Sequence, residues 1–316
     1  MDRVKKMRVA AIVTVLLFAL VAAAGFASRS PVVMSFHQER RVAVIRVTGP
    51  IVGGNSDPVS LGGSSGTTSG ELMRQFRKAR KDDSVKAVLL RIDSPGGSAA
   101  ATQEAAQELQ RLKDAGKPVI VSMGDTAASG AYWLAAYGDK VFANPSTITG
   151  SIGVYISYYD LQGLSQKLGV SEEKIKSGAH KDIFSPFRPM TPEERQITQT
   201  MVNDMYNQFV AVVAKERHME EPAVRALADG RVFTGEQAQK AGLVDAMGNY
   251  YDALAYAGKL IDADPDKVPT VAYTEPVSWQ QLLKGDLSVF RFIQSAYGAE
   301  NNIPLPLLLM KRGWQH

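Results

Sequence analysis

The fold is decided by residues 85–97, which read Val-Lys-Ala-Val-Leu-Leu-Arg-Ile-Asp-Ser-Pro-Gly-Gly. The mostly apolar run from Val85 to Ile92 is typical of a strand that is buried on both faces of a parallel sheet. Ser94-Pro-Gly-Gly97 ends this strand. A helix is predicted from there to about Ala115, because apolar side chains recur at helical spacing at Ala101, Ala105, Leu109 and Leu112.

The segments on either side continue this alternation. We predict strands over 41–48, 118–122, 140–143 and 150–157, a helix that begins after Thr68 and runs to about Arg80, and a short helix over 127–137. Strands that alternate with helices indicate βαβ units and a largely parallel sheet.

The later part of the chain is more helical. Thr191-Pro-Glu-Glu194 is a strong helix start, with Thr as the N-cap, Pro at the first position and Glu at the third. The apolar stripe that follows is expected to pack in the core: Ile197, Met201, Met205, Phe209 and Val212. Further helices are predicted after Thr234 and over Tyr250 to Ile261.

The N-terminus carries a membrane signal. Residues 9–27 are apolar or small except for Thr14, and a membrane helix needs about 20 such residues. The basic residues Arg3, Lys5, Lys6 and Arg8 precede this run, so the N-terminus is expected in the cytoplasm and the rest of the chain outside. We favour a retained anchor over a secretory signal cleaved near Ala22–Ala24 or Ala27, because the run is long for a signal core.

Composition excludes several classes of protein. The net charge is +4, and the N-terminal basic cluster accounts for much of it. The charge is therefore a sign of membrane topology and does not indicate nucleic-acid binding. The sequence has no cysteine, which excludes disulfides, thiolate metal sites and a cysteine nucleophile.

Three segments contain candidate catalytic groups. Ser129 is flanked by small residues in Thr126-Ala-Ala-Ser-Gly-Ala-Tyr-Trp133, near a predicted helix start whose unpaired N–H groups, such as that of Gly130, would hold an oxyanion. The glycines of Ser94-Pro-Gly-Gly97 let a backbone approach a ligand and expose N–H groups. Lys181 lies in a polar segment and is a candidate base, whereas His180 or His218 would serve a Ser-His-Asp triad; these residues alone leave both open.

Taken together, the chain resembles the signal peptide peptidase A (SppA) family of Ser–Lys peptidases, which are related in fold to ClpP and crotonase. It is similar to the short, single-repeat form of Gram-positive bacteria. Five segments carry the resemblance over roughly residues 40–260: Leu90–Gly97, Ser122–Gly130, Thr149–Val154, Lys176–Asp182 and Asp229–Gly235.

The resemblance implies Ser129 as nucleophile and Lys181 as general base. It implies an oxyanion hole from the amides of Gly96 and Gly130, with Gly97 shaping the loop, and Ser151 as the residue that orients the lysine. The implied mechanism needs no cofactor and no metal. Because a base must be uncharged, we expect burial on assembly or on substrate binding to remove the proton of the lysine, and Asp182 to point away from it.

The resemblance also implies substrates and an assembly. The family degrades remnant signal peptides and similar apolar peptides. Its short form is a homo-oligomeric ring, for which eight subunits is one candidate number, with the serine and the lysine meeting across a subunit boundary. The expected organisation is a cytoplasmic N-terminus (1–8), a transmembrane anchor (9–27), a juxtamembrane stem (28–40), an extracytoplasmic α/β peptidase domain with a helical extension (41–275) and a C-terminal tail (276–316).

Three alternatives remain at this point. A crotonase-fold acyl-CoA enzyme would use the glycine loop for a thioester oxyanion, but it needs no membrane span. A related membrane peptidase of the stomatin-linked type would share the dyad and act on another target. An inert envelope scaffold would not need Ser129 and Lys181.

Overall fold

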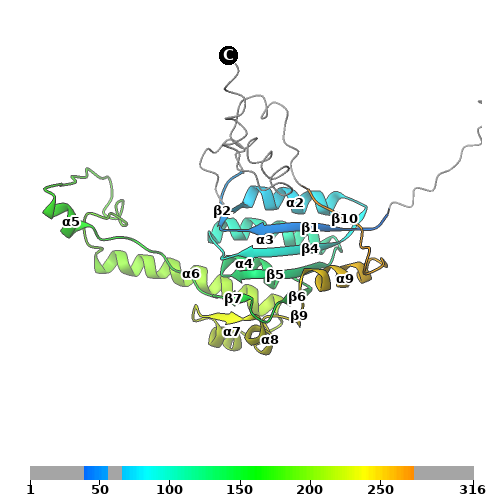
Figure 1. Ribbon diagram of the computed structural model, residues 1–316. Coiled ribbons are helices and arrows are strands. Elements are labelled where there is room, and N and C mark those ends of the chain that lie inside the picture. The colour runs from blue at the N-terminus through cyan, green and yellow to red at the C-terminus, as the bar shows by residue number, and fades with distance from the viewer. Residues whose placement is uncertain (1–38, 56–65, 274–316) are drawn as a thin grey trace, which may run out of the picture. The chain divides into compact units, whose positions relative to one another are not determined.

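The computed structural model describes residues 39–55 and 66–273. An eight-stranded sheet forms the centre of this part of the chain (Figure 1). Its main path has the order β10-β1-β4-β5-β6-β9, and all neighbours on that path are parallel. These strands are β10 (Thr270–Val271), β1 (Arg41–Thr48), β4 (Val85–Ser94), β5 (Val119–Ala128), β6 (Lys140–Ala143) and β9 (Ala246–Met247).

Helices cover both faces of the sheet (Figure 1). α2 (Ser69–Lys81), α3 (Ala99–Asp114) and α4 (Gly130–Ala136) pack on one face, and α9 (Tyr250–Leu260) packs on the other. Because side chains alternate along a strand, β1 contributes Ala43, Ile45 and Val47 to the larger core, and Val42 and Val44 to the core under α9. The predicted α/β class is confirmed, and the mixed fold with a central sheet fits a ClpP/crotonase-like architecture.

The far end of β5 differs from the prediction. The strand does not stop at 122 but continues to Ala128, because its last residues pair with β7 (Ile148–Gly150). β7 pairs in turn with the antiparallel β8 (Val232–Thr234). β2 (Ile51–Val52) and β3 (Thr67–Thr68) form a separate pair beside the glycine loop.

The predicted strand over 150–157 is wrong. The strand lies just before it, and residues 151–161 have no regular structure. The reason is local: Ser151 has a φ of 50°, and its N–H donates to the carbonyl of Arg231, so the chain turns away from β5. The helix expected over 127–137 likewise begins only at Gly130.

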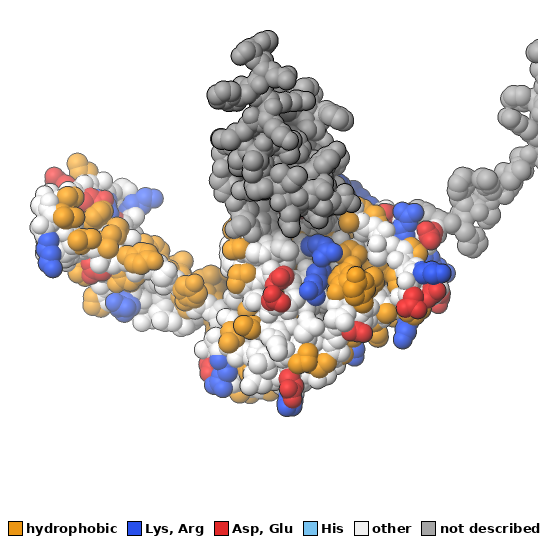
Figure 2. All heavy atoms as spheres, viewed as in Figure 1, with side chains coloured by type: hydrophobic (Ala, Val, Ile, Leu, Met, Phe, Trp, Pro, Cys, Tyr) orange, Lys and Arg blue, Asp and Glu red, His pale blue; other side chains and the backbone are white. Residues whose placement is uncertain are grey.

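The long helix α6 (Pro192–Glu216) has the predicted N-terminal capping box. Its apolar stripe, however, is only partly core. Phe209 is 2% exposed, whereas Ile197 and Met201 are 37% and 46% exposed. Only the C-terminal half of the helix reaches the core. Most residues from 155 to 190, including the short α5 (Gln162–Lys167), are exposed or half-buried. Several of the exposed side chains in this segment are large and apolar (Figure 2).

The remaining helices are α7 (Glu221–Leu227) and α8 (Gly235–Lys240), the second of which has the predicted cap at Thr234. None of the helices in the described ranges is long and apolar enough to cross a membrane. The predicted anchor at 9–27 and the tail at 276–316 lie outside those ranges.

Candidate active site

Ser129 lies at the sharp junction between β5 and α4. Its backbone has φ 54° and ψ −126°, a conformation that costs a non-glycine residue about 1–3 kcal/mol. Hydrogen bonds hold it on both sides: the Ser129 N–H donates to the carbonyl of Gly150 at 2.8 Å, and the Trp133 N–H donates to the carbonyl of Ser129 at 3.0 Å. The strand and the helix therefore impose a strained turn that presents a single hydroxyl.

The glycine loop after β4 lies directly against this turn. A Cβ built on Gly96 would lie 2.7 Å from the nitrogen of Gly130 and 2.8 Å from Cβ of Ser129. A Cβ on Gly97 would lie 2.0 Å from the carbonyl oxygen of Ile51. Both glycines have a positive φ, so close backbone approach and conformation both require glycine here.

The amides of this loop are not equivalent. The Gly96 N–H donates to Oγ of Ser94 at 3.1 Å. Within the described residues, the N–H of Gly97 donates no hydrogen bond to the protein, and that nitrogen lies 3.4 Å from the Cβ position of Gly130. Gly130 is the first residue of α4, where helix N–H groups have no intrahelical acceptor. Two unengaged amides, of Gly97 and Gly130, thus lie close together beside Ser129.

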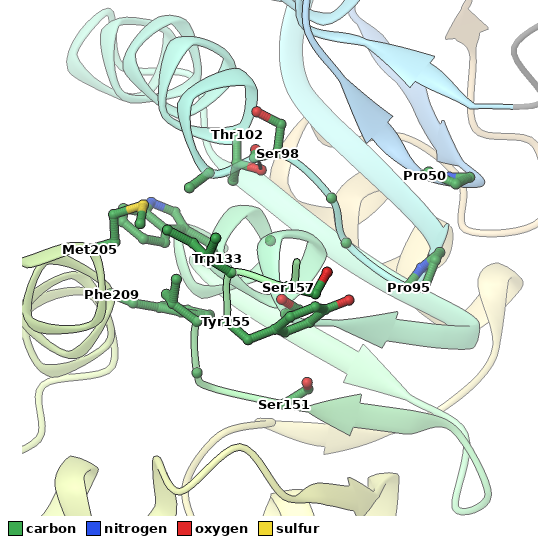
Figure 3. A pocket seen from close by; sticks show the side chains of 18 residues that line it. Pro50, Pro95, Ser98, Thr102, Trp133, Ser151, Tyr155, Ser157, Met205 and Phe209 are labelled. Atoms are coloured by element: carbon green, nitrogen blue, oxygen red, sulfur yellow. Dashed lines mark hydrogen bonds between the residues drawn. The ribbon is translucent and has the colours of Figure 1, made fainter. Parts of the chain in front are cut away.

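These residues line one cavity of about 810 Å³ (Figure 3). Of the residues predicted for the site, Ser129, Gly96, Gly97, Gly130 and Ser151 all line it. Ser151 directly follows Gly150, the residue that accepts the hydrogen bond from Ser129. The half-buried Ser151 therefore lies beside the serine turn. The structure brings these five residues together from three separate segments.

The cavity has an apolar wall that sequence reasoning missed. Trp133 of α4 and Phe209 of α6 pack with ring centroids 4.9 Å apart, and Met205 continues this wall along α6 (Figure 3). Val154, Tyr155 and Ile156 line the cavity from the irregular segment after β7. One signal was present, because Trp133 follows Ser129 by one helical turn and so lies on its side of α4.

Lys181 does not line this cavity in its own chain. It is exposed, in a run of turns where its N–H donates to the carbonyl of Gly178 at 3.2 Å. The neighbouring carboxylate of Asp182 accepts hydrogen bonds from Arg188 and Lys176, which hold the pKa of that carboxyl well below its usual range. Within the described residues, no ion pair joins Asp182 to Lys181, as the sequence led us to expect.

The histidine alternative finds no support in this geometry. Neither His180 nor His218 lines the cavity of Ser129. His180 lies instead 3.8 Å from Glu194, and His218 borders a different, polar cavity. In the described part of the chain, no group of three or more His, Asp or Glu side chains is arranged to hold a metal ion.

Comparison with known proteins gives the family. Residues 111–264 match the model of peptidase family S49. Over 246 residues the chain is 39% identical to "Putative protease slr0021" of Synechocystis, covering 78% of this chain and 83% of that protein.

Two other relatives carry more specific names. The chain is 45% identical over 182 residues to "Putative signal peptide peptidase SppA" of Enterococcus faecium, covering 58% of this chain and 53% of that protein. It is 37% identical over 231 residues to "Protease 4" of Haemophilus influenzae, covering 73% of this chain and 36% of that protein. The chain thus spans about half of the length of the Enterococcus relative and about a third of the Haemophilus one. With its strained serine beside paired glycine amides, the chain belongs to peptidase family S49, a family of serine peptidases of the SppA type.

Proposed function

We propose that this chain is a membrane-anchored serine endopeptidase with a Ser–Lys dyad, in which Ser129 of one copy pairs with Lys181 of a neighbouring copy. The observation that carries the proposal is the separation of the two groups within one chain. Ser129 is half-buried beside unengaged amides in a cavity with an apolar wall, whereas Lys181 is exposed and belongs to a segment outside that cavity.

The helix α6 supports a dyad shared between copies. The turns that carry Lys181 are bound to its first turn through Glu194, whereas Phe209 near its other end lines the cavity of Ser129. Because an α-helix rises 1.5 Å per residue, these two residues are about 22 Å apart along the helix axis. A rigid helix of this length supports donation of the lysine to another copy.

Assembly also supplies what the base needs. An exposed ammonium stays charged, and only a desolvated amine loses its proton readily at neutral pH. Insertion into the apolar cavity of a neighbour, against Trp133, Met205 or Tyr155, would desolvate the amine. The exposed apolar side chains of the same segment, among them Tyr159, Leu164 and Ile175, fit burial against another copy of the chain.

The residues then act in sequence. The neutral Lys181 amine takes the proton of the Ser129 hydroxyl, whose oxygen attacks the substrate carbonyl. The amides of Gly97 and Gly130 donate to the oxyanion, and Ser151 orients the lysine. The Gly96 amide already donates to Ser94, so Gly96 acts as the close-packed residue that places the amide of Gly97. The lysine returns the proton to the leaving amine, and water hydrolyses the acyl-enzyme.

The proposed substrates are apolar peptides, including signal peptides left in the membrane after cleavage. The apolar wall of Trp133, Met205 and Phe209 supports this choice, as does the name of the Enterococcus relative. Membership of family S49 speaks against the acyl-CoA alternative. A stomatin-linked target would use the same dyad and differ only in the peptide preferred.

The test is complementation between two inactive chains. Ser129→Ala and Lys181→Ala should each abolish cleavage of a synthetic signal peptide by the full chain in detergent. When the two are co-expressed and purified together through two tags, random mixing in a ring leaves about a quarter of the boundaries with both groups, so about a quarter of wild-type activity should return. Absence of any recovery in a mixed assembly would refute the shared dyad.

A further inference from the structure

The segment that carries Lys181 is bound to the start of α6 by one arginine. Arg188 donates from Nε and Nη2 to the two carboxylate oxygens of Asp182, at 2.9 and 2.8 Å. It also donates from Nη1 and Nη2 to the two oxygens of Glu194, at 2.8 and 2.6 Å. One guanidinium therefore joins the residue directly after Lys181 to the first turn of the helix.

Only arginine has the geometry for this contact. Its planar fork presents two pairs of parallel N–H groups, and the structure places one carboxylate on each pair. The side chain of Glu194 is only 2% exposed and also accepts the N–H of Thr191, so the contact is fixed to the helix cap. A lysine at this position would supply the charge without the fork.

Further contacts hold the same turn. Lys176 donates to Asp182 at 2.6 Å and to the carbonyl of Ala179 at 2.9 Å. His180, directly before Lys181, lies 3.6 Å from Glu193 and 3.8 Å from Glu194. His180 thus lies against the first turn of α6, and Asp182 is joined to that turn through Arg188.

The other end of α6 is anchored in the core. Phe209, Val210 and Val213 are buried, and Phe209 packs on Trp133 beside the cavity of Ser129. Because one end of α6 is fixed in the core and the other end is bound to the lysine turn, the helix holds that turn in a fixed position. Loss of the Arg188 contact between the lysine turn and α6 would therefore be enough to misplace Lys181.

Arg188 lies outside the reacting groups. It does not line the cavity of Ser129, and it contacts the carboxylate of Asp182 and not the lysine itself. By engaging that carboxylate it also keeps the negative charge next to Lys181 away from the amine, which would otherwise favour the charged, inactive ammonium.

We propose that Arg188 is a positioning residue for catalysis, which holds the Lys181 turn on α6 so that the lysine enters the cavity of a neighbouring copy. This inference rests on the dyad shared between copies. It predicts a specific asymmetry, because Arg188 should matter only in the copy that donates the lysine and not in the copy that donates the serine.

The experiment places Arg188→Gln on one chain or the other of the complementing pair. On the Ser129→Ala chain, which donates the lysine, it should lower kcat of the mixed assembly by on the order of 10²-fold with KM unchanged, since a displacement of about 1 Å has that effect. On the Lys181→Ala chain it should leave the activity of the mixture intact. Arg225→Gln is the matched control, because Arg225 also contacts α6, through Asn207 and Tyr206, but not the lysine turn.

Two further arms keep the outcomes distinct. Asp182→Asn keeps the shape of the turn and removes the charge that Arg188 binds, so it should show the same asymmetry in a folded protein. Arg188→Lys on the lysine-donating chain should restore only part of the activity, since an ammonium lacks the fork. Equal losses in both placements, or no loss in either, would overturn the role of Arg188. A parent mixture without activity would instead overturn the shared dyad.

Discussion

Replacing Gly96 by alanine tests how closely the glycine loop packs on the nucleophile. The new Cβ would lie 2.7 Å from the nitrogen of Gly130, 2.7 Å from the carbonyl oxygen of Ala128 and 2.8 Å from Cβ of Ser129. Ordinary van der Waals contact begins at 3.4 Å, so the loop or the serine turn must move by about 0.7 Å. The backbone at φ 98° adds strain of about 1–3 kcal/mol.

Both effects act on the reacting groups. The methyl group would cover the amide of Gly130 and displace Ser129. Loss of one oxyanion donor costs about 10²–10³-fold in kcat. We therefore expect kcat/KM for an apolar peptide to fall by at least about 10²-fold. The melting temperature should also fall, by about 2–4 °C per kcal/mol for a domain of this size.

Gly116→Ala is the matched control. Gly116 has φ 79°, and a Cβ there meets no atom within 4 Å, at the end of α3 away from the cavity. This variant should show the thermal shift of backbone strain with full peptidase activity. The assays are peptide cleavage, thermal melting and labelling by a serine-reactive probe. A folded Gly96→Ala protein that cleaves within threefold of the wild-type rate would refute the close packing of loop and nucleophile.

Three other predictions concern the apolar wall of the site and the first turn of α6. Phe209→Ala should destabilise the fold by about 3–5 kcal/mol, seen as a lower urea midpoint, because a 2%-exposed ring leaves a cavity beside Trp133; a shift below 1 kcal/mol would contradict this packing. Met205→Glu should raise KM for an apolar peptide by roughly tenfold or more, whereas Met205→Leu should not; equal KM values would show that substrate does not reach the wall. Hydrogen bonds from Arg188 lower the pKa of Glu194 from 4.5 to about 2, so its stabilisation is present above pH 4.5 and is lost as the pH falls toward 2. The stability difference between wild type and Glu194→Gln should therefore be full at pH 6 and shrink below pH 4.5; a difference that grows in acid would contradict this sign.

Local patterns predicted most of the elements correctly. The buried strand at 85–92, the capping box at Thr191 and the helix that begins at Tyr250 all follow from short-range patterns of sequence, and the structure has them. The errors lie where contacts with a distant segment decide the secondary structure. β5 runs on to Ala128 because it finds β7, and the stretch after Gly150 fails to be a strand because Ser151 bonds to Arg231.

The candidate site divides along the same line. The small residues around Ser129 and the paired glycines can be recognised from the sequence, because close backbone approach requires small side chains at these positions. The helical periodicity predicts Met205 and Phe209 as ordinary core, because it shows which helix face is apolar but not whether that face meets core, cavity or solvent. The exposed positions Ile197 and Met201 show the same limit.

By itself, the sequence determined the α/β class, the family, and the small residues around Ser129 and the paired glycines after β4, because these depend on local patterns of residue type; the strained backbone at Ser129 comes from the structure. Only the tertiary structure decided which loop amides stay unengaged, and that Lys181 lies outside the cavity of Ser129 in its own chain, bound through Arg188 to the far end of α6. The physical reason is that hydrogen-bond partners and the reach of a helix are set by segments that meet only in the folded chain.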